Sequence, residues 1–439
     1  MKITMPEPVR LIISHLSAAG YEAYAVGGCI RDSIAGAVPH DWDICTSALP
    51  QQVETVFSDK HIIETGLQHG TITLMINHIG YEITTYRTEG TYSDRRKPDY
   101  VNFVTDLHED VKRRDFTINA MAYNDENGLQ DYFGGAEDLA AKIIRCVGIA
   151  DERFNEDALR ILRAMRFAAT FDFEIESETA LAMHRNKELL SYVSMERIAV
   201  ELLKLLKGAG AARILREFSD ILAVVMPEIE PCIGFDQHSK WHCYDVWEHT
   251  LHAIDAAEKD EIIRLTMLLH DIGKPECYTN TDGEGHFYDH AIASYKTAQR
   301  ILKRLKLSND ITDTVCTLTR HHDAYAQIGK KGLKRLINQI GMDNARRLIK
   351  VTYADMCGQA PDKRMLKEER LEYVRKTLDS IEENNECVSV RSLAVDGHDM
   401  MELGFKGREI GEALNRALNA VIGEEVENER NALIEYLKK

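Results

Sequence analysis

Two acidic residues, Asp41 and Asp43, stand two positions apart shortly after the glycine pair at residues 27–28. The apolar run before the glycines predicts a strand, and residues 39–46 predict a second one. Side chains at positions i and i+2 of a strand share a face, so the two carboxylates would lie side by side. Their repulsion favours a hard divalent cation, Mg²⁺, which bridges nucleotide phosphates. The spacing predicts nucleotidyl transfer, although such acids alone are also typical of a solvated strand edge.

Groups that bind phosphate are expected beside these acids. Gly28 lets the backbone approach a phosphate closely, and Arg31 lies in the short helix predicted after it. Further along, residues 112–114 are three basic residues before Asp115, at a predicted junction between a loop and a helix. A helix N-terminus with a guanidinium nearby, here Arg114, binds phosphate readily. Without a ligand, the same run is a charged helix start.

A predicted helix at residues 155–169, with Asn155 as its cap, carries a charged residue at every third position. These charged residues are Asp157, Arg160, Arg163 and Arg166. The spacing places them in one continuous polar ridge along the helix. On its own, such a ridge is the pattern of an ordinary salt-bridged helix surface.

Together these motifs resemble those of a known family. G-G-x-x-R-D followed by D-x-D is similar to the signature of the polymerase β nucleotidyltransferase superfamily. The run R-R-D-F-T-I-N-A and the E-D-x-x-R motif resemble the class II tRNA nucleotidyltransferase (CCA-adding) and bacterial poly(A) polymerase branch. The resemblance implies a Mg²⁺-dependent enzyme whose partners are tRNA, CTP and ATP. It also implies that Asp41 and Asp43 are catalytic, with the metal activating the primer 3′-hydroxyl and stabilising the leaving pyrophosphate.

The resemblance assigns roles to the surrounding residues as well. Asp115 would support the site. The residues implied to contact the nucleotide phosphates are Gly28, Arg31 and Arg114. Arg163 and Arg166 would hold the triphosphate or support the residues that read the base.

Base selection has a physical explanation in the Asp157–Arg160 pair. Cytosine and adenine each present an exocyclic amine beside an unprotonated ring nitrogen. A carboxylate accepts from the amine, and a guanidinium donates to the ring nitrogen. Guanine and uracil present the reverse order, so they would leave buried groups unpaired. The hypothesis is that this pair admits C and A and rejects G and U.

Two neighbouring segments complete the predicted site. Residues 81–87 alternate like a strand, and Glu82 on it is a candidate third carboxylate or a surface residue. Residues 88–99 are polar and interrupted by Gly and Pro, which predicts a loop. This loop, around Asp94 and Arg95, resembles the flexible loop of family members that add the terminal A.

A second set of potential ligands lies in the C-terminal half. Its order of histidines and acids resembles that of HD-superfamily metal phosphohydrolases, with H-D-I-G-K-P after an apolar run. The ligands expected for a first metal are His249, His270, Asp271 and Asp355. His290, with His321 or His322, would carry a second metal or orient a substrate phosphate. Because His270 and Asp271 are adjacent, they can reach one cation only at a helix end or kink.

The resemblance implies a divalent transition metal or Mg²⁺ in this HD domain. The activities it implies are a 2′,3′-cyclic phosphodiesterase or a phosphatase that trims RNA ends. A competing interpretation is that the region mainly grips tRNA. Residues 296–350 contain 13 Lys and Arg against four Asp, a net charge of +9 in a chain whose total is −17. Such a basic region can steer a polyanion, but it also fits the solvated faces of helices.

Composition excludes several classes of protein. The 439-residue chain is 44% hydrophobic, without the ~20 consecutive apolar residues of a membrane span. Its nine cysteines form no C-x-x-C pair, which favours a reducing cytoplasm over a disulfide framework or a zinc ribbon. We therefore expect a cytoplasmic protein with no membrane partner, while its oligomeric state stays open.

The predicted architecture is an α+β nucleotidyltransferase head, with a small mixed or antiparallel sheet, followed by all-α neck, HD and tail domains. The boundaries are residues 1–146 for the head, 147–235 for the neck, 236–362 for the HD domain and 363–439 for the tail. The favoured function is CCA addition to tRNA. Three alternatives stay open: an A-adding enzyme or poly(A) polymerase, an HD metal phosphohydrolase with a nucleotide-binding head, and a tRNA-binding scaffold without catalysis.

Overall fold

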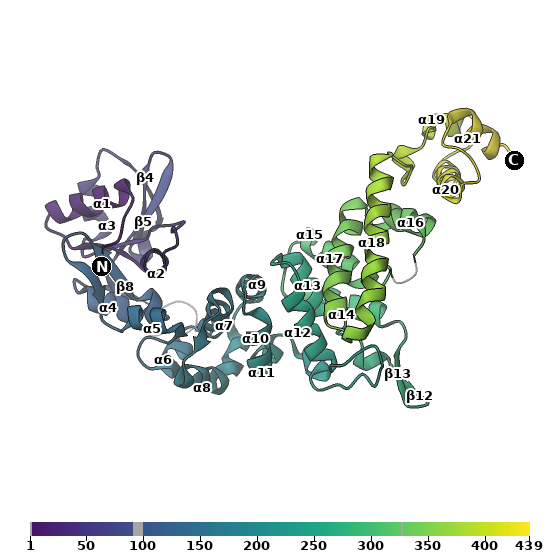
Figure 1. Ribbon diagram of the computed structural model, residues 1–439. Helices are drawn as coiled ribbons and strands as arrows, with labels where there is room; N and C mark the ends of the chain where they lie inside the picture. The colour runs from purple at the N-terminus through teal and green to yellow at the C-terminus, as the bar shows by residue number, and fades with distance from the viewer. Residues whose placement is uncertain (1, 91–99, 326–327) are drawn as a thin grey trace. The chain divides into compact units, whose positions relative to one another are not determined.

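The computed structural model describes residues 2–90, 100–325 and 328–439. The chain forms two compact units, Met1–Pro227 and Glu228–Lys439 (Figure 1). Asp94 and Arg95 of the predicted loop lie outside the described residues.

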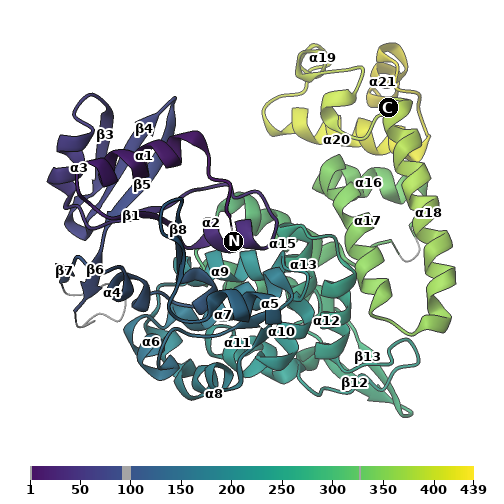
Figure 2. The same cartoon turned by 60° about the vertical axis from the view of Figure 1, so that its left-hand side comes forward.

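Unit 1 begins with a seven-stranded mixed sheet (Figure 2). In sheet order the strands are β3 (His61–Gly66), β4 (Thr71–Ile76), β5 (Ile79–Thr85), β2 (Ile44–Thr46), β1 (Ala23–Val26), β8 (Met121–Asn124) and β9 (Gly128–Asp131). Neighbouring strands are antiparallel except β2 and β5, which are parallel. All four residues of β1 are buried, as their apolar character predicts.

Helices cover this sheet. Helix α1 (Glu7–Ala18) packs on β1 and β2, because its buried residues recur at helical spacing and form one apolar face. Helix α2 (Gly28–Ile34) follows β1 directly, and α3 (Pro50–Val56) packs on α1. Further elements of this part include β6 (Arg87–Glu89), β7 (Val101–Phe103), α4 (Leu107–Lys112), η2 (Thr117–Asn119) and α5 (Gly135–Ala141).

The rest of unit 1 is mainly helical. Its longer helices are α7 (Leu159–Phe171), α8 (Ser177–Asn186) and α9 (Met195–Leu206), with α7 packed on α9. The shorter ones are α6 (Ala150–Glu156), α10 (Ala211–Glu217) and α11 (Ser219–Val225). A purely helical chain after residue 146 is wrong here, because β11 (Glu174–Ile175) pairs in parallel with β10 (Ile143–Ile144).

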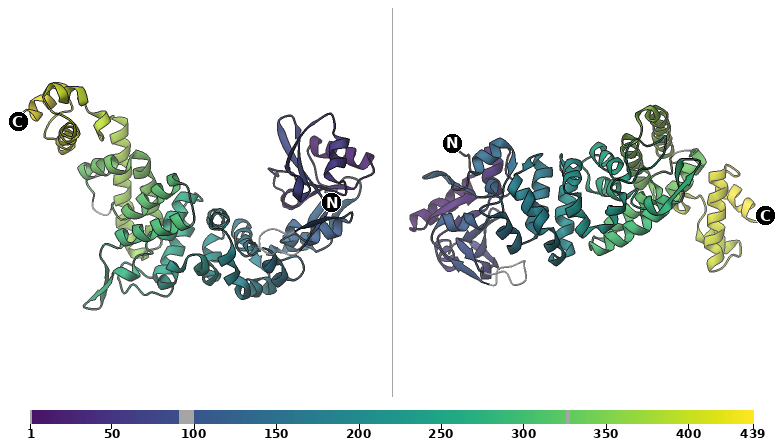
Figure 3. Two further views of the ribbon diagram at one scale, coloured as in Figure 1. Left: turned by 180° about the vertical axis from the view of Figure 1, so that it is seen from behind. Right: turned by 90° about the horizontal axis from the view of Figure 1, so that it is seen from below.

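Unit 2 contains a bundle of helices from which one hairpin projects (Figure 3). The helices are α12 (Val246–Ala256), α13 (Glu261–Leu269), α14 (His290–Arg304), α15 (Asn309–His321), α16 (Lys330–Ile340), α17 (Met342–Cys357) and α18 (Pro361–Glu383). Helix α17 contacts α12, α13, α15 and α18, so it lies at the centre of the bundle. The hairpin of β12 (Tyr278–Thr281) and β13 (Glu284–Phe287) is a second departure from the all-helical prediction.

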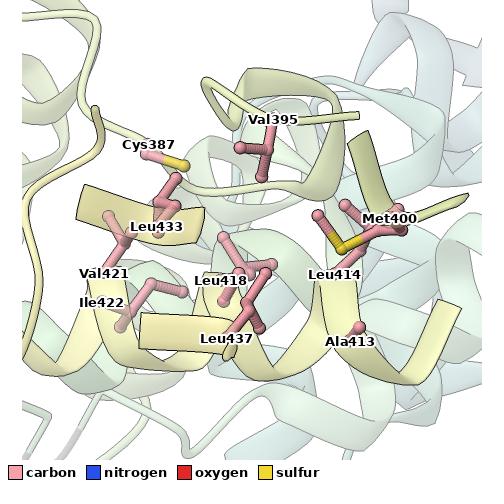
Figure 4. Packing of buried hydrophobic residues seen from close by; sticks show 11 residues of the cluster. Cys387, Val395, Met400, Ala413, Leu414, Leu418, Val421, Ile422, Leu433 and Leu437 are labelled. Atoms are coloured by element: carbon pink, nitrogen blue, oxygen red, sulfur yellow. The ribbon is translucent and has the colours of Figure 1, made fainter. Parts of the chain in front are cut away.

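The last part of unit 2 has its own hydrophobic core (Figure 4). Helices α19 (Gly397–Glu402), α20 (Arg408–Gly423) and α21 (Arg430–Leu437) surround it. Met400, Leu418 and Leu433 are almost completely buried there. The predicted domain boundaries after residues 146, 235 and 362 remain predictions.

All nine cysteines are free thiols. Among the described residues, no helix combines the length and the apolar character that crossing a membrane requires.

Candidate active site and metal centre

Asp41 and Asp43 lie immediately before β2, and not within it as the sequence suggested. The predicted alternation nevertheless holds, since Trp42 is buried while both acids are exposed. The backbone N–H of Val26 in β1 donates to the carbonyl of Asp43 at 3.0 Å, which ties the segment to the sheet. Both carboxylates therefore face solvent from an anchored backbone.

The third acid, Glu82, belongs to the same group. In the parallel register Ile83 of β5 faces Ile44 of β2, which places Glu82 next to Asp43. Reduced hydration raises the pKa of Glu82, and the charges of Asp43 and Asp41 add to the effect. The pKa of Asp43 is also raised by reduced hydration and by Asp41, while Arg114 partly offsets the increase. Three acids that repel one another fit a divalent cation.

Arg114 lies against the turn between β1 and α2. A Cβ atom at Gly27 would be 2.9 Å from Nη1 of Arg114, and Gly27 has a φ of +83°, so this position needs glycine. Arg31 in α2 donates to Asn119 at 2.6 Å and to Asp32 at 2.8 Å. Its guanidinium also lies 4.7 Å from the ring centre of Phe171. Gly28, Arg31 and Arg114 thus meet at one end of α2.

The R-R-D run follows a helix instead of beginning one, because α4 ends at Lys112 and Arg113 is its C-cap. The buried Asp115 accepts from Asn119 at 3.0 Å and from Nε of Arg163 at 2.9 Å. Burial alone would raise the pKa of Asp115, but Arg163 and the hydrogen bonds hold it below its usual value. Asp115 therefore stays ionised and connects this segment to α7.

The single helix predicted over residues 155–169 is broken at Asp157. Asn155 lies inside α6 and is not a cap, while Asp157 is the C-cap of α6 with extended backbone angles. The Asp157 carboxylate accepts from Leu159 N–H at 3.1 Å, which competes with continuation of the helix. Asp157 pairs with Arg197 of α9, through contacts of 2.6 and 3.2 Å.

Arg160 is held from several sides. It is paired with Glu156, and it donates to the carbonyls of Arg153 at 3.1 Å and Arg113 at 3.0 Å. Thus the structure brings Asp157 and Arg160 to the same helix break, each with partners beyond the predicted pair.

Arg163 and Arg166 both approach Glu201 of α9. Nε of Arg166 is 2.6 Å from Glu201, and Nη1 of Arg163 is 3.8 Å from it. The Arg166 guanidinium also lies 3.8 Å from the ring centre of Phe167. The arginines of the predicted ridge are therefore part of a charge network between α7, α9 and Asp115.

Unit 2 gathers the predicted HD ligands in two groups that share one residue. In each group the potential ligand atoms lie within 4.8 Å of one another. The first group is His249, His270, Asp271 and Asp355, and the second is Asp271, His290 and His322. His270 is the C-cap of α13, so the adjacent His270 and Asp271 meet at a helix end as expected.

Asp271 offers one oxygen to each group. Its Oδ2 is 3.1 Å from Nε2 of both His249 and His270. Its Oδ1 is 3.4 Å from Nε2 of His290 and 3.7 Å from Nε2 of His322. Lys274 also reaches Oδ2, at 2.7 Å. One carboxylate therefore joins the two groups.

Backbone hydrogen bonds fix the orientation of all four imidazoles. Each Nδ1 lies 2.7 to 2.9 Å from a backbone carbonyl oxygen, so it must donate, and Nε2 of a neutral ring carries the lone pair. The carbonyls belong to Gly358, Met267, Phe287 and Thr319. Nε2 atoms then face each other at 3.1 Å in one pair and 3.2 Å in the other. Lone pairs that face each other, as between His290 and His322, fit a cation between them.

Electrostatics in the first group also favour positive charge. The pKa of His270 is raised to about 10, because Asp271 and Asp355 outweigh the effect of burial. The same contacts hold the pKa values of Asp271 and Asp355 well below their usual range against burial. The pKa of His322 is lowered to about 4 by burial, so its ring is neutral at pH 7.

His321 and His322 lie on different faces of α15, and this decides which of them joins the second group. The buried residues Val315, Leu318 and Thr319 lie on one face, and His322 continues that face at helical spacing. His321 is half-buried and stands outside both groups. This periodicity was present in the sequence and could have made the distinction.

A cavity of about 570 Å³ opens beside the two groups. Besides ligands it is lined by residues that sequence reasoning missed, namely Trp241, His242, Phe287, Lys367 and Arg370. Lys367 and Arg370 come from α18, about a hundred residues after His270. Their only sequence signal was positive charge, which does not reveal such a contact.

The basic region at residues 296–350 is partly neutralised by acids from elsewhere in unit 2. Arg304 pairs with Glu228 at 2.7 Å, and Lys350 pairs with Glu258 at 2.7 Å. Further pairs join Lys334 to Glu386 and Arg346 to Asp379. The surface is therefore less positive than the sequence count indicates.

Comparisons with known proteins cover the whole chain. Residues 23–145 match the family model described as poly A polymerase head domain, residues 172–233 that of a probable RNA and SrmB-binding site of polymerase A, and residues 287–437 a putative tRNA nucleotidyltransferase domain 2. The CCA-adding enzyme of Lactobacillus delbrueckii is 35% identical over 431 residues, covering 97% of this chain and 96% of that protein. The chain belongs to the CCA-adding enzyme family.

Other CCA-adding enzymes are also similar over nearly the full length. That of Bacillus velezensis is 33% identical and covers 97% of this chain and 96% of its own. The crystal structure of the Bacillus stearothermophilus CCA-adding enzyme in complex with CTP is 30% identical, with a TM-score of 0.71 and coverage of 99% and 97%. These matches confirm the predicted fold class and the tRNA nucleotidyltransferase class. None of the three matching family descriptions names an HD domain, which stays a prediction.

Proposed function

We propose that this CCA-adding enzyme transfers CMP and AMP from CTP and ATP to the 3′ ends of tRNA in the cytoplasm. The observation that carries the proposal is the gathering of Asp41, Asp43 and Glu82, with Arg114 within electrostatic reach of Asp43. The relatives support it, since they are CCA-adding enzymes and one of them is in complex with CTP. We propose residues 1–146 as the catalytic head and 147–235 as the neck.

Asp41 and Asp43 would hold Mg²⁺, whose charge relieves the repulsion between them. Mg²⁺, when bound, supplies charge neutralisation for the triphosphate. The turn at Gly28 leaves room for phosphate, and Arg31 and Arg114 bring two guanidinium groups to the same end of α2. These residues would orient the α-phosphate toward the primer 3′-hydroxyl.

Asp157 and Arg160 would read the base at the break between α6 and α7. The Asp157 carboxylate accepts from the exocyclic amine of C or A, and Arg160 donates to the adjacent ring nitrogen. Arg163 and Arg166 would hold the triphosphate from the next turns of α7. Their pairing with Asp115 and Glu201 fixes their positions.

A single assay tests this function. Purified protein is incubated with Mg²⁺, tRNA lacking its CCA end, and each nucleotide alone or in combination. We expect two C residues with CTP alone, and C-C-A with CTP and ATP. Addition of A alone to a tRNA ending in CC would replace the proposal by an A-adding enzyme, and long A tails would indicate a poly(A) polymerase.

We propose a second function for residues 236–362, as a metal-binding HD domain. Residues 363–439 are proposed as a separate tail. The two ligand groups around Asp271 would bind divalent cations and hydrolyse a phosphoester, such as a 2′,3′-cyclic phosphate or a terminal phosphate of RNA. Imidazole-rich ligands favour transition metals over Mg²⁺. The facing lone pairs of His290 and His322 at 3.2 Å support a second cation, because a phosphate oxygen placed between them would be repelled.

Metal analysis and hydrolysis assays test this second function. Wild-type protein should retain a transition metal after dialysis and release phosphate or open a cyclic phosphate. Asp271→Ala should abolish both without loss of tRNA affinity or of CCA addition. If Asp271→Ala keeps its metal, Asp271 is not a required ligand. If it loses tRNA affinity together with activity, the region acts mainly in tRNA binding.

A further inference from the structure

Helix α9 carries two charged residues on one face. These residues contact α7 and the break at Asp157 between α6 and α7. Arg197 and Glu201 are separated by four positions, so they project from the same side. Arg197 contacts Asp157, while Glu201 contacts Arg166 and Arg163. One helix therefore supports both the residue proposed to read the base and the residues proposed to hold the triphosphate.

The contact between Arg197 and Asp157 has the geometry of a two-point clamp. Nη1 donates to Oδ1 at 3.2 Å, and Nη2 donates to Oδ2 at 2.6 Å. Only 25% of the Arg197 side chain and 16% of the Asp157 side chain are exposed. Two parallel bonds between a planar guanidinium and a planar carboxylate fix the plane of the carboxylate, which one bond would not do.

Asp157 needs such a clamp because its backbone gives little support. It lies between α6 and α7 with φ −141° and ψ 102°, outside either helix. Its side chain has one further bond, from Leu159 N–H to Oδ1. Each carboxylate oxygen has two lone-pair positions, so Oδ2 can accept from Arg197 and still accept from a base amine.

We propose that Arg197 is a positioning residue that sets nucleotide selectivity by fixing the carboxylate plane of Asp157. The inference rests on the proposed function of Asp157, through which Arg197 would act. With the clamp, Oδ2 accepts from the amine of C or A and repels the carbonyl of U or G. Without it, the carboxylate rotates, and a rotated carboxylate accepts less well and repels less.

Glu201 provides an internal contrast. Because Glu201 supports Arg163 and Arg166, which meet phosphates common to all nucleotides, its loss should weaken binding of CTP and UTP equally. Loss of the Arg197 clamp should instead change the ratio between them. A merely structural role for α9 would make both variants behave alike.

The experiment compares Arg197→Gln and Arg197→Lys with Glu201→Gln and with the control Arg185→Gln. The control removes another two-point ion pair, between Arg185 of α8 and Asp151 of α6, which is more exposed and includes no residue proposed to bind nucleotide. The readouts are the Kd of CTP and UTP by calorimetry and the kcat and KM of single-nucleotide addition to tRNA lacking CCA. Thermal melting checks that each variant is folded.

For Arg197→Gln we expect the ratio of kcat/KM with CTP to kcat/KM with UTP to fall by ~10-fold or more, because a charge-assisted hydrogen bond is lost. Most of this change should appear in the KM values. Arg197→Lys keeps the positive charge but not the planar guanidinium. Its CTP-to-UTP ratio should therefore lie between those of Arg197→Gln and the wild type. Arg185→Gln should keep the wild-type ratio.

An unchanged CTP-to-UTP ratio in folded Arg197→Gln, or an equal loss for both nucleotides, overturns the inference. If Arg197→Gln does not fold, an unchanged ratio in Arg197→Lys has the same meaning. Failure of the wild-type protein to add C and A would instead overturn the proposed function, so the two results are distinguishable.

Discussion

The two clusters of acids in this protein differ in what surrounds them. Asp41 and Asp43 in unit 1 lie on an exposed segment, where reduced hydration of Asp43 and, to a smaller extent, the charge of Asp41 raise the pKa of Asp43. Asp271 and Asp355 in unit 2 face imidazoles and a lysine, so their pKa values are held low. His249 and His270 are completely buried, whereas the acids of unit 1 are open to solvent.

This difference indicates how much of a cation's coordination the protein itself would supply at each site. In unit 1 the protein contributes a few carboxylates, and the remaining oxygens around a cation would come from the nucleotide. In unit 2 the potential ligands already lie together, and each of the four histidines is oriented by a backbone carbonyl. We therefore expect unit 1 to bind its cation weakly unless nucleotide is present, and unit 2 to retain metal through purification.

The largest expected effect is in unit 1. The double substitution Asp41→Asn and Asp43→Asn removes the charge that would hold Mg²⁺ but preserves size. Nucleotide addition should fall by ~10³-fold or more, because charge stabilisation in the transition state is lost. Gel-based addition assays measure this rate. The metal content of unit 2 should stay at the wild-type level, and normal addition by the variant would remove unit 1 as the catalytic site.

The next effect concerns the second ligand group in unit 2. His322→Ala should reduce the bound metal by about one ion per chain, whereas its neighbour His321→Ala should leave it unchanged, since only His322 reaches Asp271. Plasma mass spectrometry after dialysis gives the stoichiometry. Equal metal content in the two variants would mean that the second group does not bind a cation.

A smaller effect is expected from the support of His249. A Cβ atom at Gly358 would lie 2.7 Å from Nδ1 of His249, so Gly358→Ala should displace the ring. We expect metal affinity to fall by ~10- to 100-fold, as for other outer contacts of metal ligands, and stability by ~1–3 kcal/mol. The matched control is Gly411→Ala in α20, where no atom lies within 4 Å. Competition with a chelator measures the affinity, and identical values would contradict the geometry.

The smallest effect concerns pH and a buried acid of unit 1. The pKa of Asp115 is lower in the folded protein than in the unfolded chain, because Arg163 stabilises its charged form. Its contribution to stability is therefore present above the unfolded value of ~4 and is lost as pH falls through the folded value. Asp115→Asn should flatten the decline of unfolding free energy below pH 4, measured by urea titration. If the unfolding free energy of the variant declines below pH 4 as steeply as that of the wild type, Asp115 is not the cause of the decline.

The sequence predicted much of both sites because each site contains short motifs whose residues are neighbours in the chain. Burial of Trp42 between two acids follows from local alternation, and the meeting of His270 with Asp271 follows from a helix end. Other features were not predictable in this way. At the helix break, Asp157 is paired with Arg197, forty residues later, and the cavity wall includes Lys367, almost a hundred residues after Asp271. Such contacts arise from tertiary packing, which local patterns do not encode.

The partial neutralisation of the basic region has the same origin. Counting charges at residues 296–350 suggested a strongly positive surface. Its partners, among them Glu228, Glu258 and Glu386, belong to segments outside the counted window. A local charge count is therefore an upper limit for the field that a nucleic acid would meet.

The sharing of Asp271 between two groups constrains how this centre could be lost during evolution. A change at that single position would remove a ligand from both groups at once. Changes at His290 or His322 would spare the other group, so descendants with half a centre should differ from this chain at those histidines and keep the aspartate. The pattern of surviving residues in related proteins would then record the order in which the centre decayed.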